Sequence, residues 1–130
     1  MTESHVLWAS KDTSYIATPV LKDDHIYWLN MNGIRYSVDA KTGKRIQRQR
    51  TPGVSGGRGV KFFASMLVSG DHVYAVSRSS GTFVMKATPD LPLVAQNKFE
   101  DDDSEFNGSP AVSDNELFLR SNKFLYCIGE

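Results

Sequence analysis

Asp24-His25-Ile26-Tyr27 reads DHIY, and Asp71-His72-Val73-Tyr74 reads DHVY 47 residues later. The residues before the two tetrapeptides also align without a gap, 17–21 with 64–68. A third copy runs from Gly108-Ser109-Pro110 to Tyr126-Cys127-Ile128. Self-similarity at a period of roughly 45 residues is the signature of a protein built by repeating one structural unit.

Each copy alternates short apolar runs with turn-forming residues, which is typical of antiparallel strands. In the first copy we expect strands at 18–21, 26–29, 35–38 and 45–49, separated by turns at 22–24, 31–33 and 41–44. No window longer than one turn has a helical period. Four strands per repeat predict an all-β chain made of four-stranded antiparallel β-propeller blades.

The copies divide the chain into one partial propeller domain over residues 1–130. We expect an orphan outer strand in 1–13, centred on His5–Ala9, then blades at 14–50, 61–100 and 105–130, the last without its fourth strand. The orphan strand either completes the third sheet or belongs to a blade outside the chain. Propellers have four to eight blades, so three blades form an incomplete ring. The expectation is the C-terminal part of a larger propeller, and the alternative is a homodimer that closes six blades through open edges.

The composition excludes several classes of partner. The 130 residues include 15 Lys and Arg and 15 Asp and Glu, so no net charge attracts nucleic acid or an anionic membrane surface. Apolar runs reach only three or four residues, too short to cross a bilayer. The N-terminal residues have no pattern of a secretory signal. A single cysteine, Cys127, excludes an internal disulfide and a cysteine-based zinc site.

The first copy, TPVLKDDHIYWLNMNGIRYSVDAKTGKRI, resembles the repeat of PQQ-like (pyrroloquinoline quinone) β-propellers. Its most specific piece is VDAKTGK, residues 38–44. The third copy, SPAVSDNELFLRSNKFLYCIGE, resembles a closing blade of this superfamily of quinoprotein alcohol dehydrogenase-like proteins, and VLWAS, residues 6–10, resembles its outer strand. The resemblance covers essentially the whole chain and implies the propeller fold.

The resemblance implies two kinds of protein. Quinoprotein dehydrogenases close a ring of about eight blades around the quinone and a calcium ion, and many place adjacent cysteines beneath the cofactor. Three repeats and one cysteine depart from that pattern, so we expect no cofactor, no metal and no catalysis. The leading interpretation is a non-catalytic scaffold for protein or ligand binding. The alternatives are the remnant of a PQQ-dependent dehydrogenase and a binding module of the cell envelope or of polysaccharide, since the family is often exported.

His25 and His72 are the first candidates for metal ligands or general bases. They occupy the same position of two copies, and Glu116 occupies it in the third. A residue repeated at one position of every unit is interpreted as structural or solvent-facing. No nucleophile elbow or catalytic triad pattern accompanies the histidines.

Two links between copies have unusual compositions. Residues 53–59 are rich in glycine, but the spacing of a phosphate-binding P-loop and its helix are missing, so a flexible connection is expected. Residues 101–105 hold four carboxylates, and calcium is the functional alternative. The glycine and glutamate of an EF-hand loop are replaced by Phe106 and Val112, so a solvated loop is expected.

Cys127 lies between Tyr126 and Ile128 on an expected strand. A small thiol that is buried or half-buried is expected there rather than a nucleophile. The aromatic residues at strand positions are interpreted as packing between blades.

One surface is the candidate for binding. In a four-stranded meander, the turns between second and third strands and the links between blades share one face. Loops on a rigid scaffold commonly hold binding residues. The charged residues of that face form the candidate site, namely Arg50, Arg58, Asp101, Asp102 and Asp103.

Overall fold

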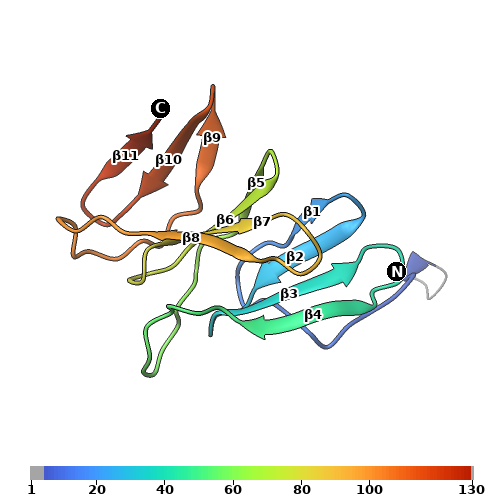
Figure 1. Cartoon of the computed structure of the whole chain (residues 1–130). Helices are drawn as coiled ribbons and strands as arrows, with labels where there is room; N and C mark the ends of the chain where they lie inside the picture. Colours follow the sequence, from blue (N-terminus) through green and yellow to red (C-terminus); the bar gives the residue numbers. More distant parts are fainter. Residues whose placement is uncertain (1–4, 130) are drawn as a thin grey trace.

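Three separate antiparallel sheets make up the computed structural model, which describes residues 5–129 (Figure 1). The first two sheets have four strands and the third has three, and strands consecutive in the chain are neighbours. The described residues contain no α-helix, and so no helix that could span a bilayer. The predicted all-β fold of incomplete propeller blades is confirmed. The strands are β1 Val20–Lys22, β2 His25–Leu29, β3 Ile34–Asp39, β4 Arg45–Arg50, β5 Leu67–Ser69, β6 His72–Val76, β7 Thr82–Lys86, β8 Leu93–Asn97, β9 Ala111–Ser113, β10 Glu116–Arg120 and β11 Leu125–Ile128.

The three sheets fall inside the residue ranges expected for the three blades, 14–50, 61–100 and 105–130. Residues 1–4 of the expected outer strand, and Glu130 at the end of the third range, lie outside the described part of the chain.

Short turns with left-handed backbone connect the first two strands of the sheets. The angle φ is 49° and 63° at Asp23 and Asp24, 56° at Gly70, and 50° and 64° at Asp114 and Asn115. Asp, Asn and Gly adopt positive φ at lower cost than other residues, and such turns match the twist of a β-hairpin. The repeated residues at these positions therefore encode a repeated hairpin.

The main core lies between the first and second sheets. Tyr27 and Leu29 of β2 meet Val73 of β6 and Phe83 of β7, and no member of this group is more than 2% exposed. Phe62, from the link between the sheets, packs with Phe83 at a ring distance of 5.9 Å. Burying a side chain of this size contributes about 1.5–3 kcal/mol, so this junction holds the two sheets together.

A smaller cluster joins the second and third sheets. Val76 of β6 and Ala64 of the link pack with Leu119 of β10 and with Phe106. Tyr126 of β11 lies against this cluster. Fewer large side chains are buried here than between the first two sheets, so the third sheet is held less firmly.

Polar bonds supplement the first junction. Arg35 of β3 is 4% exposed; its guanidinium donates to the Leu91 carbonyl at 2.7 Å and to Gln49 Oε1 at 3.0 Å. The Ser37 hydroxyl donates to the Pro89 carbonyl. Desolvation lowers the pKa of Arg35. A buried charge is tolerated when it is hydrogen-bonded, so Arg35 ties β3 to the turn between β7 and β8.

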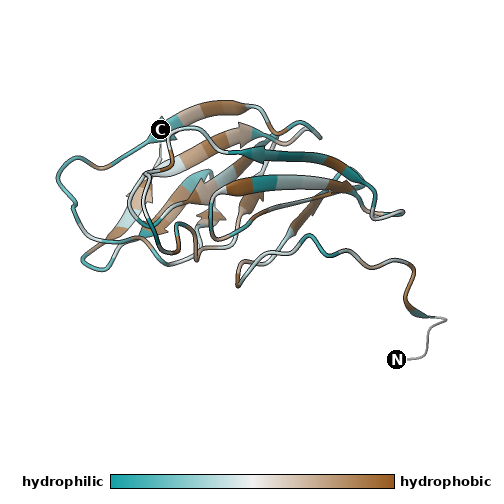
Figure 2. Cartoon of the chain, turned by 90° about the horizontal axis from the view of Figure 1, so that it is seen from below, coloured by the Kyte–Doolittle hydropathy of each residue, from teal (hydrophilic) through white to brown (hydrophobic). Residues whose placement is uncertain are grey.

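The segment before the first sheet differs from the expectation. No strand forms over His5–Ala9, where an outer strand was predicted, and the first strand of the described residues begins at Val20. The segment runs outside the sheets (Figure 2). A strand needs a free sheet edge, and the edge of β11 in the three-stranded sheet lies at the opposite end of the molecule (Figure 1).

Trp8 nevertheless anchors this segment on the outer face of the first sheet. The indole Nε1 donates to the Ala40 carbonyl at 2.9 Å, and Trp8 packs beside Trp28 and Tyr36, whose rings stack at 5.1 Å. Gly43 lies directly beneath the indole, because a Cβ there would be 2.5 Å from the ring. The Thr-Gly-Lys turn of the repeat therefore provides the packing surface on which the Trp8 indole lies.

Replacing Gly43 tests whether the packing of Trp8 depends on this glycine. Gly43→Ala should lower the free energy of unfolding by about 1–3 kcal/mol, because φ is +70° and the new methyl group would displace Trp8. Gly70→Ala is the matched control: φ is +56° and no atom lies within 4 Å of its Cβ position, so only the backbone cost of about 1 kcal/mol applies. Urea denaturation followed by tryptophan fluorescence measures both. Equal losses in the free energy of unfolding for the two variants would show that the packing of Trp8 does not depend on Gly43.

Candidate functional site

The loops between sheets gather at one end of the strands, as the meander predicted. The Lys61 amide donates to the Met31 carbonyl at 2.7 Å, and the Arg78 amide donates to the Lys61 carbonyl at 2.9 Å. The Ser55 amide donates to Ser80 Oγ at 2.9 Å. We call this surface the loop face; it comprises the two turns 31–33 and 79–81 and the two links 51–66 and 98–110.

Four of the five candidate residues are exposed near the loop face. Arg50 ends β4, Arg58 lies in the glycine-rich link, and Asp101 and Asp103 lie in the acidic link. Asp103 pairs with Lys123 at 2.5 Å, and this pair lowers the pKa of Asp103. These residues give the face charges of both signs.

The glycine-rich link is packed at its start, where Gly53 lies against Gln96 and Val54 packs on the main core, but not further along. A Cβ at Gly57 or Gly59 would meet no atom within 4 Å, and φ there is +96° and +103°. Glycine is needed at these two positions because the backbone has a positive φ, and not because another group approaches closely. The link is held by side chains at its ends, including Lys61 Nζ, which donates to the Gly56 carbonyl at 3.1 Å.

Asp102 does not belong to the exposed group. Its side chain is buried, with the residue 4% exposed, and its carboxylate accepts bonds from the Ser104 amide at 3.0 Å, the Ser104 hydroxyl at 2.6 Å and the Tyr126 hydroxyl at 2.7 Å. The expectation of a solvated loop is therefore wrong at this residue, because the link folds back under the third sheet. The Asp-x-Ser spacing, typical of an Asx-turn, was the signal that sequence reasoning missed.

Hydrogen bonding and burial shift the pKa values of Asp102 and Tyr126 in opposite directions. The hydroxyls of Ser104 and Ser121, with that of Tyr126, hold the pKa of Asp102 well below its usual range. Burial and the bond to Asp102 raise the pKa of Tyr126 to about 12. The ring of Tyr126 also stacks on Phe99 at 4.0 Å. Asp102 thus fastens the acidic link to β11.

The acidic link does not converge on an ion. Asp102 is bonded to hydroxyls and an amide, and Asp103 turns to Lys123. Within residues 5–129, no three His, Cys, Asp or Glu side chains are grouped as a metal site would require.

The histidines hold equivalent positions in their sheets. His25 begins β2, His72 begins β6 and Glu116 begins β10. Both histidines are partly buried, and His25 Nδ1 lies 2.7 Å from the Asp23 carbonyl oxygen of the preceding turn. The first position of the second strand is therefore a repeated structural position.

Cys127 is exposed, contrary to the expectation of a buried or half-buried thiol. It lies on β11, an edge strand, and on the face of the third sheet opposite the second sheet. Desolvation and the neighbouring Glu116 carboxylate raise the pKa of the Cys127 thiol. This environment therefore does not favour the thiolate that a nucleophilic cysteine needs.

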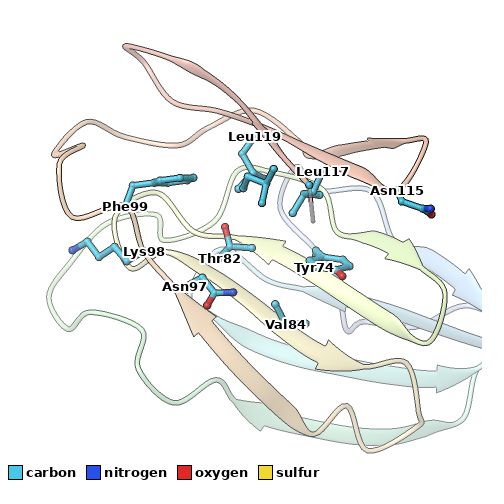
Figure 3. A pocket seen from close by; sticks show the side chains of 11 residues that line it. Tyr74, Thr82, Val84, Asn97, Lys98, Phe99, Asn115, Leu117 and Leu119 are labelled. Carbon is cyan, nitrogen blue, oxygen red and sulfur yellow. The ribbon is translucent and has the colours of Figure 1, made fainter.

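A cleft of about 470 Å³ separates the second and third sheets (Figure 3). Tyr74, Thr82 and Val84 line it from the second sheet, and Leu117 and Leu119 face them from β10. The lining combines aliphatic and aromatic side chains with hydroxyl and amide groups and with Lys98, so the cleft suits a mainly apolar group. Sequence reasoning assigned Tyr74 to packing between blades and did not find the cleft, because its size depends on how far apart the sheets stand.

Replacing the buried carboxylate tests its role. Asp102→Asn should destabilise the protein at neutral pH, because it removes the charge that the hydroxyls of Ser104, Ser121 and Tyr126 stabilise. The folded pKa is depressed, so this stabilisation is present above the unfolded pKa of about 3.9 and is lost as the pH falls through the folded pKa.

The difference in urea midpoint between wild type and Asp102→Asn should therefore shrink from about pH 7 to about pH 3. Asp103→Asn is the matched control, since its exposed pair with Lys123 contributes little. A midpoint for Asp102→Asn equal to that of the control at neutral pH would contradict the network.

No family model and no curated protein matches the chain. Among solved structures, the chain is similar to the quinohemoprotein alcohol dehydrogenase from Comamonas testosteroni, with a TM-score of 0.63 and 22% sequence identity over 82% of this chain. The match covers 17% of that enzyme's chain. At this identity the likeness concerns the fold alone. The chain has the architecture of incomplete β-propeller blades, with its loops gathered on one face.

Proposed function

We propose that the chain is a non-catalytic scaffold of the PQQ-like repeat group that contributes blades to a larger propeller and binds a protein or ligand. Two observations support the assignment to that group: the repeat with its VDAKTGK segment, and the similarity in fold to a quinohemoprotein alcohol dehydrogenase.

The main support for a non-catalytic role is that both charged side chains that are buried in the described structure are hydrogen-bonded to other parts of the chain. Among residues 5–129, the charged side chains that are buried are Arg35 and Asp102. Arg35 bonds the Leu91 carbonyl and Gln49, and Asp102 bonds Ser104 and Tyr126. Catalytic acids and bases must present such perturbed groups to a substrate, whereas these two are consumed in joining strands to loops.

The loop face is the surface that this scaffold offers. Arg50, Arg58, Asp101 and Asp103 are exposed on or beside it, while Asp102 beneath them fixes the acidic link. A rigid frame with a mixed-charge surface favours a partner that has charges of both signs.

The enzymatic alternative, a remnant of a PQQ-dependent dehydrogenase, is tested directly. We expect the purified chain, mixed with PQQ and Ca²⁺, to show no dye-linked alcohol oxidation above a protein-free control and no retention of the quinone on gel filtration. Turnover would overturn the scaffold proposal, and retention of the quinone without turnover would favour the remnant.

The loop face is tested by comparing what wild type and variants capture. The double variant Arg58→Ala/Asp101→Ala should lose partners that wild type captures from a cell extract, measured by quantitative mass spectrometry. Arg45→Ala is the matched control, because Arg45 is also an exposed arginine and pairs with Asp12 at 3.1 Å in the N-terminal segment. Partners retained by the double variant and lost by the control would contradict the proposed face.

A further inference from the structure

The two ends of the molecule have complementary open features. At one end, β11 is the edge strand of the three-stranded sheet, and the outer face of that sheet exposes Leu125 at 73% and Cys127. Phe124, just before β11, is 53% exposed. An edge strand beside exposed apolar side chains is a template for pairing with another strand.

At the other end, the segment Val6–Ala9 carries apolar side chains without belonging to a sheet. Trp8 is anchored on the Ala40 carbonyl and above Gly43. Val6 is 52% exposed and Leu7 is 88% exposed. With Trp8 held on the first sheet, the high exposure of Leu7 shows that its side chain is not packed on that sheet. A sheet packed outside the first sheet would meet Leu7.

The cleft between the second and third sheets is suited to that leucine. Val84, Leu117, Leu119 and Ile128 form the aliphatic part of its lining, and Ile128 belongs to the edge strand β11 itself. Tyr126 and Ile128 face the second sheet, whereas Leu125 and Cys127 alternate to the outer face. A fourth strand beside β11 would therefore direct alternate side chains into the mouth of the cleft.

The outer face of the first sheet also has room for a neighbouring sheet. A cavity of about 430 Å³ lies between the N-terminal segment and this sheet, lined by Val20, Leu21, Ile26 and Trp28 among others. Leu21 is 66% exposed. This apolar hollow matches the bare outer face of the third sheet in chemistry and in its place at the opposite end of the series.

We propose that a second copy of this chain occupies both features, joined head to tail. Val6–Ala9 of one copy adds to β11 of the other as the fourth strand of its third sheet, and Leu7 enters the cleft beside Ile128. Trp8 remains on its own Gly43, so the donor strand connects the third sheet of one copy to the first sheet of the next. Two such junctions close a ring of six sheets, within the four to eight of known propellers.

This inference rests on the scaffold proposal and names the partner that completes it. Strand addition supplies main-chain hydrogen bonds, and alternate side chains supply specificity. The same junction, used twice, covers the apolar faces that repeat units leave open at their ends.

Light scattering after size exclusion tests the assembly on the full chain. We expect wild type to have twice the 14.5 kDa mass of one chain and to dissociate on dilution. Leu7→Asp should weaken association by about tenfold or more, since burying a charge in the cleft is unfavourable. Val94→Asp is the matched control, because Val94 is also an exposed apolar residue, 54%, and lies on β8. Circular dichroism establishes that each variant is folded.

Mixing variants tests the head-to-tail arrangement. Leu125→Lys blocks the accepting face, and Leu7→Asp blocks the donor, so each alone should be largely monomeric. An equimolar mixture retains one intact junction and should form a heterodimer. Alkylation of Cys127 should slow at concentrations where wild type is dimeric.

Three results would overturn the proposal: a wild type that is monomeric at all concentrations, a Leu7→Asp variant that associates as tightly as Val94→Asp, or a mixture that stays monomeric although both single variants are folded. None of these results affects the quinone test or the loop-face test, so the scaffold proposal can fail or survive separately.

Discussion

The structure depends on the packing of one sheet face against the next. Tyr27 and Leu29 project from one face of the first sheet into the second, while Ile26 and Trp28 project from the other face. Because side chains alternate along a strand, a sheet with apolar residues on both faces needs a neighbour on each side. The second sheet has two neighbours and contributes side chains to both core clusters, whereas the first and third sheets each have one neighbour.

This requirement explains the differences between the ends and the middle of the molecule. The buried members of the large cluster around Phe83 are at most 8% exposed, whereas the cluster around Leu119 borders an open cleft. At the first sheet, Trp8 takes part of the place of a neighbour by covering Trp28 and Tyr36. At the third sheet nothing in residues 5–129 does so, and Cys127 and Leu125 are consequently exposed.

Buried polar groups fix the loops to this frame. Arg35 fastens the turn before β8, and Asp102 fastens the acidic link to Tyr126. Removing one partner of such a bond leaves a buried group unsatisfied, which is more costly than the bond itself is stabilising. Of these two ionised side chains, Asp102 fixes the acidic link of the loop face, whereas Arg35 fixes a turn that is not part of that face.

The sequence by itself determined the repeat, the strands and the turns of this protein, because these depend on neighbours in the chain. Alternation of apolar residues and the left-handed turn at Asp23 and Asp24 are local properties, and they indicated the three sheets correctly. The positions of the links followed from the same meander.

Burial, in contrast, was decided by the tertiary structure. Asp102 and Asp103 are adjacent and chemically identical, yet one is buried under Tyr126 and the other pairs with Lys123 in solvent. Cys127 lies between apolar residues on a strand, which predicted a buried or half-buried side chain. It is exposed because no other sheet covers that face of the third sheet. Whether a side chain is covered depends on which surface, distant in the chain, comes to lie against it, and local patterns do not contain that information.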